Sequence, residues 1–227
     1  MTGAGDDTFR APLQLAPDIL LERAAAARMP TFPVARKPAD MVEITRIDPA
    51  IRLDIRYATA GNFLGFPVYP EARAFLQRPA AMALSHARSL AAQHGYGLLV
   101  YDAYRPWHVS YLFRQAVPET LYDFVGDPAT GSRHNRGCAV DLSLWNLSDG
   151  RAVAMPSGFD EMTPRAHTSY AGGCAEARAA RDLLARIMCA SGFVPLAEEW
   201  WHFDYADWQD YPVMNLSFAA IGRGVTP

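Results

Sequence analysis

The sequence predicts an α+β fold, a single domain in which a small antiparallel sheet is flanked by helices. Two observations predict it: apolar runs rich in β-forming residues alternate with stretches of helical spacing, and no repeat or low-complexity block interrupts that pattern. The length of 227 residues fits one domain that carries an N-terminal extension. We expect the extension to cover residues 1–40 and the domain to cover residues 41–227.

The first half of the chain supplies helices and strands in turn. MVEITRI alternates apolar and polar residues, which is typical of a half-buried strand, and YGLLVYDAY is an apolar run dense in β-forming residues. The stretch before YGLLVYDAY has helical spacing and meets Gly95, which favours a helix stop. We therefore expect, in order, a short helix at 17–27, strands at 41–47 and 53–59, a helix at 79–94 and a central strand at 96–104.

The second half continues the same alternation. Pro106 can open a helix over WHVSYLFRQAV, because proline is tolerated in the first helical turn. CAEARAARDLLARIMCAS is strongly amphipathic and is closed by Gly192. We expect a helix from residue 107, a strand at 137–147, a long loop at 148–171, a helix at 173–191, and a strand or hairpin formed by FVPL and WWHFDYA.

Composition excludes several classes of protein. Half of the residues are hydrophobic, and the net charge of −3 argues against a nucleic-acid surface, which is normally basic. No run approaches the roughly 18 apolar residues that span a bilayer, and the N-terminus lacks the apolar stretch of a signal peptide. We expect a cytoplasmic protein with no membrane partner. Its three cysteines, Cys138, Cys174 and Cys189, have neither disulfide nor metal spacing.

The stretch SRHNRGCAVD places two metal-binding residue types close together. His134 and Asp141 are ligand types of hydrolytic zinc sites, in which three protein ligands and one water are common. Gly137 lets the chain turn between them, so that a loop residue and a strand residue converge. Taken alone, such a His–Asp pair is more often a capped turn or a surface ion pair.

A third ligand and a general base are found in EEWWHFDY. His202 stands at the start of an aromatic strand, and Glu199 precedes it by three residues. If His202 binds the metal, Glu199 reaches the attacking water as a general base. The alternative is a histidine satisfied in an aromatic core. The remaining histidines, His86, His94, His108 and His167, are expected to be structural, surface or rim residues.

Two further residues suit a peptide substrate. Arg105 follows a buried strand directly, where its guanidinium can stabilise an oxyanion; the alternative is a structural salt bridge. Asp160 lies in the long loop after the metal-site strand and can bind a substrate ammonium, although most loop aspartates cap turns.

These motifs resemble those of a known family. SRHNRGCAVD fits SxHxxGxAxD and EEWWH fits ExWH, a combination similar to the zinc D-Ala-D-Ala peptidases. The flanking stretches DIRYATAGNFLG, VYDAYRP and SGFDEM resemble the D-alanyl-D-alanine dipeptidases, which include those of vancomycin resistance. The resemblance extends from about residue 42 to about residue 212. It does not cover the first 40 residues and implies no role for them.

The resemblance implies a role for each matching position. One zinc ion per subunit would be held on the sheet by His134, Asp141 and His202, with Glu199 as the catalytic base and Arg105 as the transition-state arginine. Asp160 would bind the substrate amine and Ser132 would lie beside the substrate. The implied reaction is hydrolysis of D-alanyl-D-alanine to two D-alanine.

The sequence also leaves other functions open. They are a D,D-carboxypeptidase or peptidoglycan endopeptidase on the same scaffold, and a non-catalytic zinc module that binds cell-wall fragments. A binder has no need of a general base, which argues against the last. The sequence leaves open whether the chain forms a homo-oligomer, and whether its role is antibiotic resistance, recycling of wall fragments or use of D-alanine as a nutrient.

Overall fold

A five-stranded sheet of order β2-β4-β5-β7-β6 forms the centre of the computed structural model, which describes residues 8–223. Its strands are β2 (Arg52–Leu53), β4 (Tyr96–Asp102), β5 (Ala139–Asn146), β6 (Phe193–Leu196) and β7 (Glu199–Tyr205). All neighbours pair antiparallel except β2, which pairs parallel with β4 at one edge. The predicted α+β class is confirmed, and the short edge strand makes the sheet mixed.

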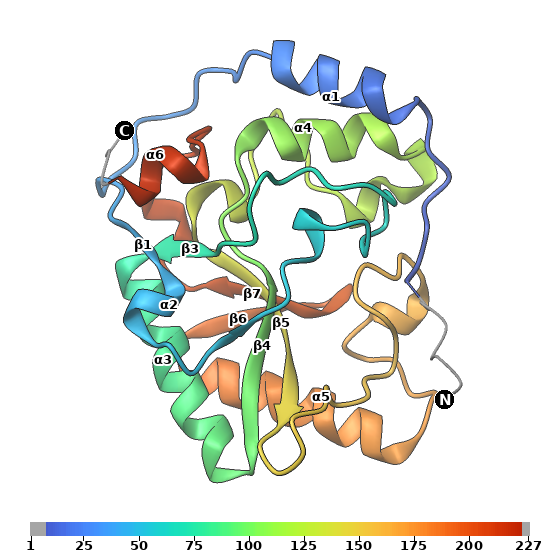
Figure 1. Ribbon diagram of the computed structural model, residues 1–227, viewed down its shortest axis with the longest axis vertical. Coiled ribbons are helices and arrows are strands. Elements are labelled where there is room, and N and C mark those ends of the chain that lie inside the picture. The colour runs from blue at the N-terminus through green and yellow to red at the C-terminus, as the bar shows by residue number, and fades with distance from the viewer. Residues whose placement is uncertain (1–7, 224–227) are drawn as a thin grey trace.

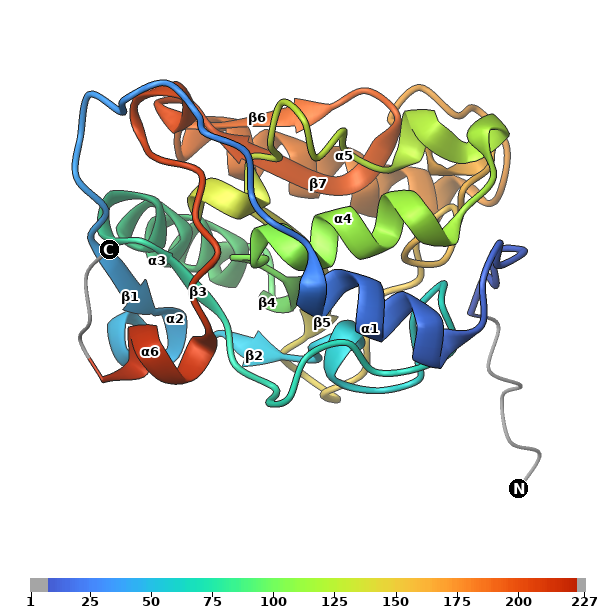
Figure 2. The same ribbon diagram turned by 90° about the horizontal axis from the view of Figure 1, so that it is seen from above.

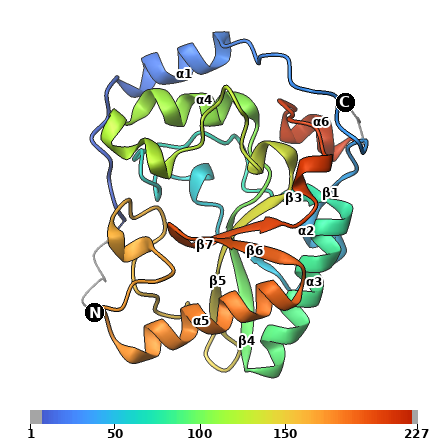
Figure 3. The ribbon, with the colours of Figure 1, turned by 180° about the vertical axis from the view of Figure 1, so that it is seen from behind.

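Helices cover both sides of this sheet. They are α1 (Pro17–Ala26), α2 (Ile44–Ile47), α3 (Arg78–Gln93), α4 (Trp107–Ala116), α5 (Ala175–Ala190) and α6 (Phe218–Gly222). In Figures 1 and 3, α3 and α5 lie together on one side of the sheet, and α4 lies on the other with α1 outside it. The view from above in Figure 2 shows α1 running alongside α4. The cavity described below opens between the sheet and the elements on the α4 side.

The long predicted elements are confirmed. The helices expected at 17–27, 79–94, 107–117 and 173–191 are α1, α3, α4 and α5, with ends shifted by one or two residues. The strands expected at 96–104 and 137–147 are β4 and β5. FVPL and WWHFDYA form an antiparallel hairpin of β6 and β7. These segments carry long, unambiguous periodicity, which is why their type follows from the sequence.

Two short predicted strands are largely wrong. Of residues 41–47, only Met41–Glu43 form a strand, β1, which pairs with β3 (Phe75–Gln77) in a separate two-stranded sheet. The chain then turns into α2, which buries Ile44 completely. Of residues 53–59, only Leu53 is in a strand, and Arg56–Ala58 form a 3₁₀ turn. That turn buries Tyr57, whose hydroxyl has a partner in a distant loop, and this tertiary contact overrides the local pattern.

The hydrophobic core lies between the sheet and the helices that cover its two sides. Fully buried side chains of β4 and β5, such as Leu98, Val100 and Leu142, contact the buried faces of α3 and α5. Within residues 8–223, no helix combines the length and the apolar character needed to cross a lipid bilayer.

Candidate active site

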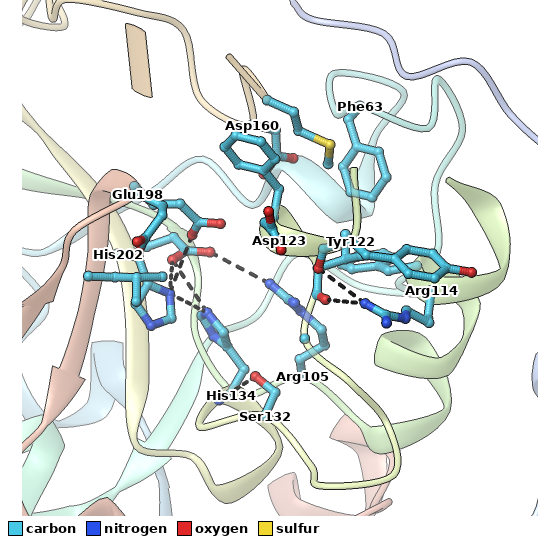
Figure 4. A pocket seen from close by; sticks show the side chains of 18 of the residues that line it. Phe63, Arg105, Arg114, Tyr122, Asp123, Ser132, His134, Asp160, Glu198 and His202 are labelled. Carbon is cyan, nitrogen blue, oxygen red and sulfur yellow. Dashed lines mark hydrogen bonds and ion pairs between the residues drawn. The ribbon is translucent and has the colours of Figure 1, made fainter. Parts of the chain in front are cut away.

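A cavity of about 310 Å³ lies against the carboxyl end of β4 and the middle of the sheet. All seven residues predicted for the site line it: Arg105, Ser132, His134, Asp141, Asp160, Glu199 and His202. Figure 4 labels five of them, and shows these side chains converging on the cavity from the sheet on one side and from loops on the other. Residues up to about a hundred positions apart in the chain thus share one cavity.

Strand register brings two of the predicted ligands together. Asp141 of β5 is the direct antiparallel partner of His202 of β7, so their side chains stand next to each other on one face of the sheet. His134 arrives from a 3₁₀ turn that ends at Gly137, where φ is +66°. Glycine suits this left-handed conformation, and a Cβ atom at Gly137 would also lie 2.7 Å from the end of the Met41 side chain, which would have to move.

The three donor atoms have the spacing of metal ligands. His134 Nε2 lies 3.1 Å from His202 Nδ1 and 3.3 Å from Asp141 Oδ1, and His202 Nδ1 lies 3.0 Å from Asp141 Oδ1. Ligands of a tetrahedral zinc ion, bound at about 2.0–2.2 Å, lie about 3.3 Å from one another. His134, Asp141 and His202 are all buried, and a donor set of two imidazoles and one carboxylate fits a divalent transition metal.

Hydrogen bonds on the far side of each imidazole fix its orientation. His134 Nδ1 donates to the carbonyl oxygen of Ala103 at 2.6 Å, and His202 Nε2 donates to Asp204 Oδ1 at 2.9 Å. With those protons placed outward, His134 Nε2 and His202 Nδ1 turn their lone pairs toward a common point. This outer layer of acceptors is typical of metal-binding histidines.

Electrostatics at that point favour a cation. Burial lowers the pKa of His202, but its hydrogen bonds to Asp141 and Asp204 outweigh burial and raise that pKa to about 10. His202 therefore carries a second proton in the metal-free protein, and this proton lies between the donors where a metal would lie. The metal position therefore holds positive charge, supplied either by a metal ion or by the second proton of His202.

Glu199 begins β7 and faces the same point. Its Oε2 lies 3.8 Å from His202 Nδ1, and the side chain is 13% exposed. Burial raises the pKa of Glu199 to about 7. The negative charge of Asp141 also raises this pKa, while His202 and Arg105 lower it. A carboxyl group poised near neutrality can both accept and release a proton, as a general acid–base requires.

Arg105 is buried and is held by a carboxylate that sequence reasoning missed. Asp102, the last residue of β4, accepts hydrogen bonds from Arg105 Nε at 3.0 Å and Nη2 at 2.8 Å, and from the Tyr69 hydroxyl at 2.9 Å. Arg105 Nη2 also lies 3.6 Å from Asp141 Oδ2. Two hydrogen bonds to one oxygen, Asp102 Oδ2, fix the guanidinium beside the metal position. The signal was available, since Asp102 stands in the quoted motif VYDAYRP.

Asp160 lies across the cavity from the ligands and has an unsatisfied oxygen. Its backbone adopts φ +59°, a conformation rare for residues other than glycine, and the Tyr57 hydroxyl donates to its Oδ1 at 3.0 Å. Its Oδ2 is buried without a hydrogen-bond partner. Burial raises the pKa of Asp160 well above its usual range, and the charge of Asp141 adds to this. A cationic group entering the cavity would satisfy the free oxygen.

Ser132 and Asn135 shape the loop that carries His134. The Ser132 hydroxyl accepts a hydrogen bond from the backbone of His134 at 3.2 Å, and Asn135 Oδ1 accepts one from the backbone of Ser132 at 2.8 Å. Asn135 is completely buried and also donates to the carbonyl oxygen of Arg105. Sequence reasoning selected Ser132 and missed Asn135, which ties the histidine loop to the arginine.

The residues set aside at the sequence level do not line the cavity. His86, His94, His108 and His167 are absent from its walls, as expected. Cys138 is completely buried beside the ligand strand, and its thiol donates to the carbonyl oxygen of Arg136 rather than facing the cavity.

Comparisons with known proteins agree with this geometry. The family model Peptidase_M15, described as D-ala-D-ala dipeptidase, matches residues 37–221. A D-alanyl-D-alanine dipeptidase of Escherichia coli (strain K12) is 37% identical over 182 residues, covering 80% of this chain and 93% of that protein. One of Enterococcus faecalis (strain ATCC 700802 / V583) is 38% identical over 74% of this chain and 92% of its own.

More distant similarities were also found. A D-alanyl-D-alanine dipeptidase of Streptomyces coelicolor (strain ATCC BAA-471 / A3(2) / M145) is 34% identical over 72% of this chain and 90% of that protein. Among solved structures, the LD-carboxypeptidase LdcB aligns with a TM-score of 0.43 and 18% identity over 75% of this chain and 69% of that chain.

Proposed function

Because the chain belongs to the D-Ala-D-Ala dipeptidase family of metallopeptidases, we propose that it hydrolyses the free dipeptide D-alanyl-D-alanine to two molecules of D-alanine. We also propose that its metal is a single zinc ion held by His134, Asp141 and His202. The observation that carries the proposal is the meeting, in one cavity, of a three-donor metal position, a carboxyl group with a pKa of about 7 and an unpaired carboxylate oxygen.

The two sides of the cavity divide the work of binding. Asp160 binds the ammonium group of the dipeptide through its unsatisfied Oδ2, and Tyr57 holds its other oxygen in place. Ser132 lies beside the substrate on the opposite side, next to the metal position. A buried carboxylate selects for a free amino terminus, because an ammonium ion neutralises its charge and an acylated nitrogen carries no charge.

The chemical step uses residues on the sheet side. A bound zinc ion would supply Lewis acidity, lowering the pKa of a water and polarising the scissile carbonyl. Glu199 takes a proton from the attacking water and delivers one to the leaving amine. The guanidinium of Arg105, fixed by Asp102, stabilises the oxyanion that forms at the scissile carbonyl.

The test is release of free D-alanine by purified protein. D-Ala-D-Ala and N-acetyl-D-Ala-D-Ala are compared, each with and without a chelator, followed by restoration with zinc. We expect chelator-sensitive cleavage of the free dipeptide and little cleavage of the acylated one. Efficient cleavage of the acylated peptide would move the assignment to a D,D-carboxypeptidase, and no cleavage by zinc-loaded protein would overturn the proposal.

A further inference from the structure

Residues 8–26, here called the N-terminal strap, lie outside the family match, which begins at residue 37, and no step of the proposed reaction uses them. Helix α1 of the strap packs along α4, whose Phe113 and Arg114 line the cavity (Figures 1 and 2). Leu20 and Ala24 of α1 are buried in that contact. The strap is therefore an integral layer of the fold on the side of the molecule that carries the cavity.

Three hydrogen bonds tie the strap to two separate parts of the cavity wall. Arg10 Nη1 donates to the carbonyl oxygen of Asn62 at 2.5 Å, and the Ala11 backbone donates to that of Phe63 at 3.0 Å. The Gln14 backbone donates to the carbonyl oxygen of Ala116 at 2.8 Å, at the C-terminal end of α4. The strap thus joins the loop of Phe63 to α4, two segments about fifty residues apart in the chain.

The joined segments carry two aromatic rings that contact Tyr57, the hydrogen-bond partner of Asp160. Phe63 and Phe113 of α4 line the cavity, with ring centroids 5.0 Å apart. Both rings contact Tyr57, at centroid distances of 6.3 Å and 4.8 Å. Tyr57 in turn donates its hydroxyl hydrogen bond to Asp160 Oδ1. A continuous series of contacts therefore leads from the strap, through Phe63 and Tyr57, to the unpaired carboxylate.

We propose that the N-terminal strap is a positioning element for the amine-binding end of the cavity, and that it restricts the enzyme to dipeptides with a free ammonium group. This inference rests on the proposed function. The residues at the metal position are held by other contacts: Asp141 and His202 by the pairing of β5 with β7, and His134 by its hydrogen bond to Ala103. Arg105 stacks on Tyr57 and Phe113, but two hydrogen bonds to Asp102 fix its guanidinium. Loosening the strap should therefore weaken substrate binding and leave the chemical step intact.

The first test compares three substitutions, each made in the whole chain. Arg10→Ala removes the hydrogen bond to Asn62, and Arg10→Lys restores a cation there. Arg36→Ala is the matched control outside the strap, where the exposed Arg36 pairs with Asp210. We expect Arg10→Ala to raise KM for D-Ala-D-Ala about fivefold with kcat nearly unchanged, since one hydrogen bond is worth about 1 kcal/mol. Arg10→Lys should recover most of the loss, and Arg36→Ala should leave KM unchanged.

A double-mutant cycle distinguishes positioning from a general structural role. If the strap acts through Asp160, Arg10→Ala should have no further effect on KM in an Asp160→Ala background. Additive losses, a fall in kcat, or an unchanged KM in Arg10→Ala protein would overturn the proposal. Thermal unfolding of each variant shows that it is folded at the assay temperature.

Binding without turnover separates this inference from the proposed function. In a Glu199→Gln background, calorimetry with D-Ala-D-Ala should show Kd rising about fivefold with Arg10→Ala. If the wild-type protein hydrolyses the dipeptide but this shift is absent, only the strap proposal fails. If the dipeptide is neither cut nor bound, the proposed function fails and the strap proposal fails with it.

Discussion

The sheet side of the cavity and its loop wall are built differently. On the sheet side, strand register fixes Asp141 and His202, and outward hydrogen bonds to Ala103 and Asp204 orient His134 and His202. On the loop wall, Asp160 sits at φ +59° with a buried oxygen that has no partner.

The difference separates two tasks. Polar side chains that are oriented before the substrate binds can hold the reacting groups in place, and paired strands are rigid enough to fix such side chains. A side that retains an unsatisfied buried carboxylate keeps a place for a group that arrives with the substrate. Mutations on the sheet side should therefore change kcat or metal binding, and mutations on the loop wall should change KM.

The largest effect should come from Glu199 on the sheet side. Glu199→Gln keeps the shape of the side chain but removes the proton acceptor, so kcat should fall by about 10²–10⁴-fold. Metal content, measured by elemental analysis, should stay at the wild-type level. The neighbouring carboxylate, in Glu198→Gln, is the matched control and should lose far less activity. A metal-free Glu199→Gln protein would mean that Glu199 is a ligand or a structural residue.

On the loop wall, Asp160→Ala should change substrate binding instead. Losing the partner of a buried ammonium should lower kcat/KM for D-Ala-D-Ala about 10–100-fold, mainly through KM. The low activity expected with N-acetyl-D-Ala-D-Ala should change little, because that substrate has no ammonium group. Equal losses on both substrates would mean that Asp160 supports the fold of the loop and not the amine.

Sequence patterns identified the sheet side more completely than the loop wall. His134, Asp141 and His202 stand in two compact motifs, and the long strands place Asp141 and His202 by register. The loop wall combines Tyr57, Phe63, Phe113 and Asp160 from segments that are distant in the chain. Of these only Asp160 was selected, and the segment of Tyr57 was wrongly predicted as a strand. Contacts between loops depend on tertiary packing, which local periodicity does not encode.

The next substitution tests the hydrogen bonds that orient the metal-binding histidines on the sheet side. Asp204→Ala removes the acceptor that orients His202, and metal affinity should fall about 10–100-fold. Competition with a chromophoric chelator measures this directly. Asp207→Ala is a suitable control, because Asp207 is an exposed partner of Lys37 in the same segment. Unchanged affinity in Asp204→Ala protein would show that the strand alone orients His202.

The pH dependence of metal binding tests the charge assigned to the metal position. Below its raised pKa of about 10, His202 holds a proton that the metal must displace. Affinity should therefore rise with pH, by about tenfold per unit for each proton displaced. Calorimetry in buffers of different ionisation enthalpy counts the protons released. Binding near neutral pH without proton release would contradict the protonated state of metal-free His202.

The smallest effect should come from Cys138, which tests whether closeness to the ligands is enough for a catalytic role. Its thiol is completely buried, burial raises its pKa well above the usual range, and the proposed reaction has no covalent intermediate. Cys138→Ala should leave kcat/KM within about twofold of wild type while lowering the free energy of unfolding by about 1 kcal/mol. Iodoacetamide should likewise modify the exposed Cys174 and Cys189 without loss of activity. A large loss of kcat in a folded, metal-loaded Cys138→Ala protein would require a nucleophile on the sheet side and would end the proposal that activated water attacks the substrate.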